Sequence, residues 1–168
     1  MLKIPKDILD AMLSHARELA PHECCGLLAG ADGLVTRLYR IKNVVALEGA
    51  GTATHFDESK VAHLQRLSPE DRAEIAFVMD ALEQGSALKD MRTKGLQLQV
   101  VYHSHPVSPA RPSLTDIQNA TEFEEIREKL NLPRPLHLII SLQDRTHPDL
   151  RAYTIENHRA VPAEFLAV

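Results

Sequence analysis

The sequence predicts a mixed α/β fold, in which one β-sheet is flanked by helices. Apolar residues recur at helical spacing near the N-terminus, and later segments contain short runs rich in Val, Leu, Ile and Tyr. These strand-like runs are too many for a helical bundle, and helix-like segments lie between them. With 168 residues, of which 44% are hydrophobic and 25% charged, the chain can form its own core, so we expect a single domain over residues 1–168.

The N-terminal part of the chain predicts a helix followed by a hairpin. Residues 7–20 place apolar side chains at helical spacing, and Pro21 ends this helix. Residues 26–30 and 34–41 have the composition of strands. The pair Asp32-Gly33 between them favours a tight turn, so we expect the two strands to be neighbours.

The middle of the chain predicts a loop and two helices. Residues 48–56 are rich in Gly, Ala and Thr and are expected to form the loop, and a helix is expected over residues 58–67. A second helix should begin at residues 68–71, because Ser is a good cap, Pro fits the first helical position and acids favour the first turn. We expect this helix to fray near Gly85. Its apolar side would consist of Ile75, Val78, Met79 and Leu82.

The C-terminal half predicts three strands and one helix. Residues 95–105 have the composition of a strand, and residues 113–130 predict a helix, with or without an interruption. Residues 135–142 and 150–156 predict two further strands, joined by a turn over residues 144–149.

Composition and charge argue against several classes of protein. A formal net charge of −4 and the lack of a basic run argue against a nucleic-acid binder. The longest apolar stretches fall well short of the roughly 20 residues that span a bilayer, and the N-terminus lacks a signal-peptide apolar segment. Cys24 and Cys25 are adjacent and cannot form an ordinary loop-closing disulfide. We therefore expect a cytoplasmic protein.

A group of possible metal ligands follows the strand that ends near residue 105. Side chains alternate along a strand, so His103 and His105 project from the same face and can share one metal ion. Pro106 helps to end the strand, and Asp116 lies in the first turn of the helix that begins at Ser113. Two histidines and an aspartate leave a fourth tetrahedral position for water, as in catalytic zinc sites.

Each of these residues also has a plain structural explanation. A single histidine in a strand is more often a hydrogen-bonded core or surface residue than a ligand, and Ser113 with Asp116 has the pattern of a helix cap. The combination of all four residues at this spacing is much rarer than any part of it. The spacing therefore predicts metal binding.

The same residues resemble the signature of the JAMM (MPN+) zinc metalloproteases, H-S/T-H-P-x(6)-S-x-x-D. Residues 103–106 match its first half and residues 113–116 its second. The family also has a glutamate before a strand that often contains C-G-L-L, and residues 21–28 supply Glu23 at that place. The resemblance extends from the first helix to residues 150–156 and is strongest to short bacterial and archaeal members. Residues 57–94 and 121–130 are extra relative to a minimal bacterial member.

The resemblance implies a single mixed sheet flanked by helices, as in JAMM/MPN and cytidine-deaminase-like folds, and a role for each motif residue. His103, His105 and Asp116 would bind Zn²⁺. Glu23, which by itself could be a surface acid after a helix, would act as general base and then general acid. Ser113 would donate a hydrogen bond to the oxyanion. The implied reaction is hydrolysis of a peptide or isopeptide bond after the Gly-Gly tail of a ubiquitin-like or sulfur-carrier protein of β-grasp shape.

Two other functions remain as alternatives. The chain could be a non-catalytic MPN-type interaction scaffold, although such members lack ligands that are present here. It could also be a DNA-repair-associated JAMM-like protein, against which its acidic charge argues. We expect Cys25 to be a small packed residue and Ser104 not to be a nucleophile. The other histidines show no ligand spacing, and we expect most of them on the surface: His15, His55, His63, His137, His147 and His158.

Overall fold

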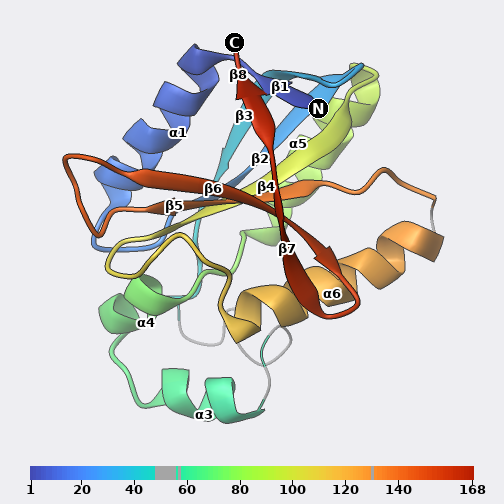
Figure 1. The fold of residues 1–168 in the computed structure, drawn as a ribbon. Helices are drawn as coiled ribbons and strands as arrows, with labels where there is room; N and C mark the ends of the chain where they lie inside the picture. The colour runs from blue at the N-terminus through green and yellow to red at the C-terminus, as the bar shows by residue number, and fades with distance from the viewer. Residues whose placement is uncertain (48–55, 57, 130) are drawn as a thin grey trace.

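The computed structural model describes residues 1–47, 56, 58–129 and 131–168 and has a mixed α/β fold, as the sequence predicts (Figure 1). The predicted loop over residues 48–56 lies outside the described residues, apart from Phe56. The strands are β1 Leu2–Ile4, β2 Cys25–Ala31, β3 Leu34–Ile41, β4 Gln97–His105, β5 Leu136–Ser141, β6 Asp149–Glu156, β7 Arg159–Ala163 and β8 Phe165–Ala167. The helices are α1 Lys6–Leu19, α3 Glu58–Gln65, α4 Pro69–Ile75, α5 Ala81–Thr93 and α6 Leu114–Lys129.

These eight strands form one sheet in the order β7-β6-β5-β4-β2-β3-β1-β8. The sheet is mixed, because β4 pairs with β5 in parallel while β2 pairs with both of its neighbours antiparallel. The predicted hairpin is confirmed: Asp32 and Gly33 both have positive φ, at 51° and 76°, which suits a two-residue turn between twisted strands. Gly26 of β2 cannot carry a side chain, because a Cβ atom there would lie 2.5 Å from the Tyr102 ring.

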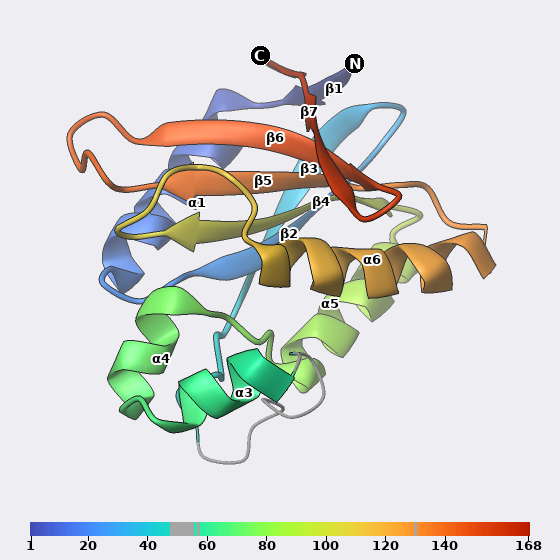
Figure 2. The same ribbon diagram turned by 60° about the horizontal axis from the view of Figure 1, so that its bottom comes forward.

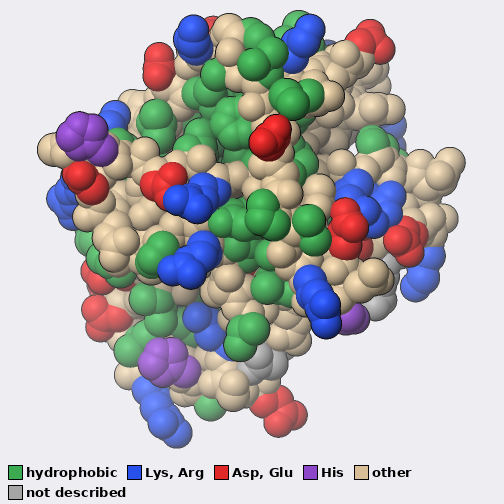
Figure 3. Space-filling view, viewed as in Figure 1, with side chains coloured by type: hydrophobic (Ala, Val, Ile, Leu, Met, Phe, Trp, Pro, Cys, Tyr) green, Lys and Arg blue, Asp and Glu red, His purple; other side chains and the backbone are tan. Residues whose placement is uncertain are grey.

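The two edge strands are consecutive in the chain. Only Glu164 separates β7 from β8, yet they pair at opposite ends of the sheet, so the sheet curls around α1. Met12 and Ala16 of α1 are accordingly buried against Leu28 and Tyr102. Hydrophobic side chains also gather on the outer face over and beside β8 (Figure 3), where Leu166 is 47% exposed. Three strands, β1, β7 and β8, are not predicted from the sequence because they are short and lack regular alternation.

The two faces of the sheet have different partners. α1 covers one face, whereas α5 and α6 lie on the other, with α3 and α4 beyond them (Figure 2). Leu27 of β2 packs with Ala87 and Met91 of α5, while its neighbour Leu28 belongs to the core around α1. The same alternation along β4 directs His103 toward the face that carries α5 and α6.

The single helix predicted from residue 68 to Gly85 is wrong. Its start is correct, since the Ser68 hydroxyl accepts a hydrogen bond from Asp71 N at 3.1 Å. However, α4 ends at Ile75, and residues 76–80 are extended before α5 begins. Asn43 Oδ1 accepts a hydrogen bond from Val78 N at 3.0 Å, and Asp80 Oδ1 accepts from the first backbone N–H groups of α5. In a continuous helix, these backbone N–H groups would instead donate to carbonyl oxygens of the preceding turn.

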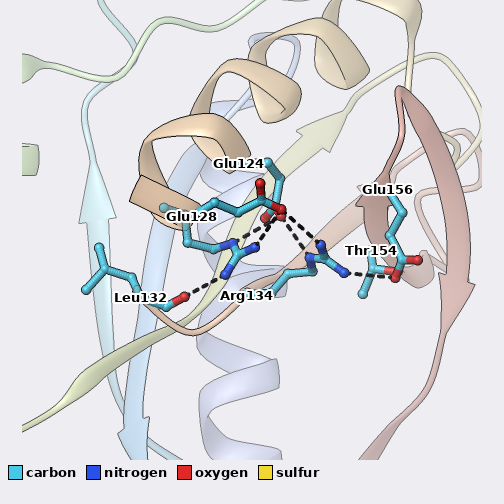
Figure 4. A network of polar contacts seen from close by, with 7 residues as sticks. Glu124, Glu128, Leu132, Arg134, Thr154 and Glu156 are labelled. Atoms are coloured by element: carbon cyan, nitrogen blue, oxygen red, sulfur yellow. Dashed lines mark hydrogen bonds and ion pairs between the residues drawn. The ribbon is translucent and has the colours of Figure 1, made fainter. Parts of the chain in front are cut away.

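An ionic network fixes the C-terminal part of α6 (Figure 4). Glu124 Oε2 accepts from Arg127 Nε at 3.0 Å and from Arg134 Nε at 2.8 Å. Arg134 also lies 3.2 Å from Glu156 at the end of β6. Because Glu124 is buried, this network is less screened than a surface pair. It ties the C-terminal part of α6 to the segment before β5 and to the end of β6.

Candidate metal centre and active site

Three possible metal ligands meet where β4 ends. His103 and His105 are both buried, and their Nε2 atoms lie 3.0 Å apart. Asp116 Oδ2 lies 3.5 Å from the Nε2 atom of each histidine. One ligand atom from each of the three residues fits within a span of 4.8 Å. We call these three residues the His-His-Asp cluster.

The chemistry of the cluster fits a bound cation. His105 Nδ1 lies 2.9 Å from the carbonyl oxygen of Pro109, which can only accept, so Nδ1 carries the proton and Nε2 presents a lone pair to the cluster. Burial opposes the charged form of Asp116, but the charge of His103 and a hydrogen bond to His103 hold the pKa of Asp116 well below the ordinary value. A carboxylate and imidazole nitrogens at this separation are a suitable donor set for tetrahedral zinc.

The loop between β4 and α6 is held in place by buried hydrogen bonds. Ser141 Oγ donates to the Ser108 carbonyl at 2.7 Å, and the Tyr153 hydroxyl donates to the Ala110 carbonyl at 2.8 Å. The helix cap that the sequence suggested is also present: Ser113 N donates to Asp116 Oδ2, and Asp116 N donates to Ser113 Oγ at 3.1 Å. The structural and the metal-binding explanations of Asp116 are therefore compatible.

Glu23 lies beside the cluster because the pairing of β2 with β4 continues beyond the N-terminal end of β2. Ser104 N donates to the Cys24 carbonyl at 3.0 Å, which brings Glu23 next to His105. The backbone of Glu23 is fixed by its N–H bond to Ala73 O at 2.6 Å. Its side chain is only 6% exposed, so it is not a surface acid. Burial, and then the charge of Asp116, raise the pKa of Glu23 well above the ordinary value.

Two cavities adjoin Asp116. The first, of about 180 Å³, is lined by Glu23, Lys60, His105 and Ser113 among others; we call it the Glu23 cavity. The second, of about 190 Å³, is mostly apolar and lies between β4, α5 and α6; we call it the Phe77 cavity. The ring of Phe77 stacks on the imidazole of His103, with centroids 4.7 Å apart.

The remaining singled-out residues have structural surroundings. The Ser104 hydroxyl accepts from Cys24 N at 2.8 Å, and the Cys25 thiol donates to the Ile41 carbonyl at 3.4 Å. Both side chains are buried, and for Cys25 this is the packing that the sequence predicts. His63, His147 and His158 are exposed as expected, and His55 lies outside the described residues. The expectation fails for His15, which is buried with Nδ1 2.9 Å from the Tyr102 hydroxyl. It also fails for His137, which is largely covered within β5. His15 lies at helical spacing from apolar residues and His137 lies within an apolar strand, and these patterns could have predicted that both are covered.

Comparison with known proteins identifies the family. The family described as prokaryotic homologs of the JAB domain matches residues 5–156 of the chain. The chain belongs to this family. It is 28% identical over 155 residues to a CysO-cysteine peptidase of Mycobacterium tuberculosis, covering 92% of this chain and 83% of that protein. It is 33% identical over 150 residues to a desampylase of Haloferax volcanii, covering 86% and 83%.

A solved structure has a similar fold. A solution structure of a protein from Desulfitobacterium hafniense has a TM-score of 0.69 and 31% identity, and the match covers 100% of this chain and 93% of that one. The family match and the names of the relatives identify this JAB-family chain as a JAMM-type hydrolase. Within the described part of the chain, no helix is long and apolar enough to cross a membrane.

Sequence reasoning missed several residues that line the site of this JAB-family hydrolase. Lys60 and Phe77 come from the segment that was recognised only as extra length. Asn119 of α6 and His137 line the Phe77 cavity, and their buried Oδ1 and Nε2 atoms have no hydrogen-bond partner among the residues described. No local motif marks these four residues, because only the packing of distant segments brings them to the cluster.

Proposed function

We propose that the protein hydrolyses the amide or isopeptide bond that follows the Gly-Gly tail of a ubiquitin-like or sulfur-carrier protein of β-grasp shape, with zinc as its cofactor. The observation that carries this proposal is the position of buried Glu23 beside the His-His-Asp cluster, in a cavity that also contains Ser113. The names of the two relatives, a CysO-cysteine peptidase and a desampylase, support the class of substrate.

His103, His105 and Asp116 would hold the zinc ion. When bound, zinc would supply Lewis acidity and lower the pKa of a water molecule toward neutrality. The hydrogen bond from His105 to the Pro109 carbonyl would keep this ligand in the correct tautomer and orientation.

Glu23 would move the proton. Its raised pKa suits a group that accepts a proton from the attacking water and then gives it to the leaving amine at near-neutral pH. Because the amine must come within hydrogen-bond reach of this carboxyl group, the leaving group would occupy the Glu23 cavity.

Ser113 would stabilise the oxyanion. Its Oγ atom accepts a hydrogen bond from Asp116 N, so the hydroxyl proton can be donated elsewhere. The side chain is exposed at the edge of the Glu23 cavity, where a substrate carbonyl can reach it.

The carrier tail would enter from the opposite side of Asp116, along the Phe77 cavity. One side of this cavity is formed by the extended residues 77–79 and the other by α6. An extended segment can pair with a tail by strand addition, and a tail without side chains can come close to the cluster beside the Phe77 ring, which stacks on His103. Replacing either glycine of the tail with Val should therefore depress kcat/KM severely.

Mass spectrometry of candidate carriers tests the proposal directly. Each carrier, bearing an extension after Gly-Gly, would be incubated with the zinc-loaded protein. We expect one carrier to lose the mass of its extension, a chelator to stop the reaction and added zinc to restore it. Cleavage that is indifferent to chelation, or equal cleavage of a Val-substituted tail, would contradict the proposal.

A further inference from the structure

The Glu23 cavity contains a cation that the proposed chemistry does not yet use. Among its described lining residues, Lys60 is the only Lys or Arg, and it lies with three carboxylates, those of Glu23, Glu74 and Asp116. Lys60 Nζ donates to the Ile75 carbonyl at 3.3 Å, and Ile75 also lines the cavity. This hydrogen bond holds the ammonium group at the side of the cavity formed by Ile75.

The charge of Lys60 acts where the leaving group would lie. It lowers the pKa of Glu23, against the larger effect of burial, so its field reaches the carboxyl group that would protonate the leaving amine. Lys60 is half-buried, where an ammonium group interacts with an opposite charge more strongly than in open solvent.

We propose that Lys60 binds the α-carboxylate of the leaving group, so that the protein releases a free amino acid from the carrier tail and not a protein lysine. This inference rests on the proposed function. In an α-linked amino acid the carboxylate is attached to the carbon that bears the scissile nitrogen, so it enters the cavity together with the amine. An acceptor lysine would instead place apolar methylene groups beside Lys60, which gain nothing from its charge.

The reaction balances without a further reactant. The oxygen of one water molecule bonds to the carbonyl carbon of the terminal glycine, and the bond from that carbon to the amino-acid nitrogen breaks. Glu23 carries a water proton to this nitrogen, so the products are a carrier with a C-terminal carboxylate and a free amino acid. The cavity volume of about 180 Å³ favours an amino acid with a small side chain.

Three matched substrates test the role of Lys60. A β-grasp carrier ending in Gly-Gly would be extended with L-serine, with L-serinamide, or with the Nε atom of a lysine peptide. We expect the wild-type kcat/KM for the carboxylate substrate to exceed that for the amide by about 10- to 100-fold, the size of a hydrogen bond to a charged group. Lys60→Met should remove this preference by slowing only the carboxylate substrate.

Two further variants sharpen the result. Lys89→Met alters an exposed lysine of α5 that does not line the cavity, and should leave the preference unchanged. Glu74→Gln removes a competing negative charge from the cavity and should increase the preference several-fold. If Lys60→Met slows all three substrates equally and shifts their pH profiles together, Lys60 acts only by tuning Glu23, and the inference is wrong.

A binding measurement separates this inference from the proposed function. L-Serine should shift the NMR signal of the Lys60 side chain in the zinc-loaded protein, whereas L-serinamide should not, and Lys60→Met should weaken L-serine binding about 10-fold or more. If no carrier is cleaved but this pattern holds, the proposed function fails while the carboxylate site stands. Equal binding of serine and serinamide, or unchanged binding by Lys60→Met, overturns the inference.

Discussion

The His-His-Asp cluster and the segment that faces it across the Glu23 cavity are built in different ways. The cluster is carried by β4, a central strand paired on both sides, and by the first turn of α6. The facing segment, α3 and α4 with residues 76–78, packs on a small apolar cluster of its own, separate from the core around α1. The proposed metal ligands thus lie on elements of the central sheet and on α6, whereas the residues proposed to contact the substrate from the other side lie on a segment with a small core.

The largest effect is expected from removing the rigid ligands. His103→Ala combined with His105→Ala should abolish zinc binding and activity, because only Asp116 of the three ligands remains. Metal analysis of the purified protein should fall from about one zinc per chain, as expected for one site, to none, while circular dichroism reports an intact sheet. Retention of all the zinc would show that the ligands lie elsewhere.

A matched pair of core truncations tests whether the two regions are separate. Leu138→Ala in β5 removes a fully buried side chain from the main core and should lower the free energy of unfolding by about 2–5 kcal/mol. Leu64→Ala in α3 removes the same atoms from the smaller cluster, and should raise hydrogen exchange mainly in residues 58–79. An equal loss of protection throughout the sheet in both variants would show that the regions unfold as one unit.

A substitution of Glu23 tests catalysis separately from metal binding. Glu23→Gln keeps the size of the side chain but removes its ability to carry a proton, so the rate should fall at least ~100-fold. Zinc content should not change, since Glu23 lies beside the cluster without belonging to it. Near-wild-type turnover would remove Glu23 from the mechanism.

Ser113 should show a smaller effect on rate together with one on stability. Ser113→Ala removes the proposed oxyanion donor and should lower kcat about 100-fold. It also removes the hydrogen bond to Asp116 N, which should lower the free energy of unfolding by about 1 kcal/mol. Ser113→Thr keeps a hydroxyl and should recover most of the stability. Full activity of Ser113→Ala would contradict the assignment of Ser113 as the oxyanion donor.

The smallest effect concerns pH and stability. Burial, and then the charge of His103, lower the pKa of His137 to about 4 from 6.5, so the unfolded state binds more protons between these values. The stability that neutral His137 contributes is complete above pH 6.5 and falls as the pH falls. In metal-free protein, going from pH 7.5 to 5.5 should cost about 1 kcal/mol through this residue. Denaturant titrations of His137→Gln at the two pH values should lack this loss of unfolding free energy. The same pH dependence in the variant and the wild type would contradict the role of His137.

Local patterns in the sequence were enough for the hairpin and for the residues of the cluster. Asp32-Gly33 specifies a turn whose twist matches that of the flanking strands. Strand alternation places His103 and His105 on one face, and the cap between Ser113 and Asp116 fixes where the following helix begins. Each of these features depends on residues only a few positions apart.

Only the tertiary structure decided what surrounds the cluster. Ile75, Val78 and Leu82 have helical spacing, but the side chain of Asn43, more than thirty positions away, bonds Val78 N and helps to end α4 at Ile75. Glu23 follows a helix and could have been exposed, yet pairing beyond β2 buries it and raises its pKa. Lys60 reaches the same cavity by a third segment. The physical reason is that the burial of a side chain, its charged neighbours and its hydrogen bonds to distant residues all depend on tertiary packing. The spacing of residues in the sequence predicts only which side chains share one face of a helix or strand.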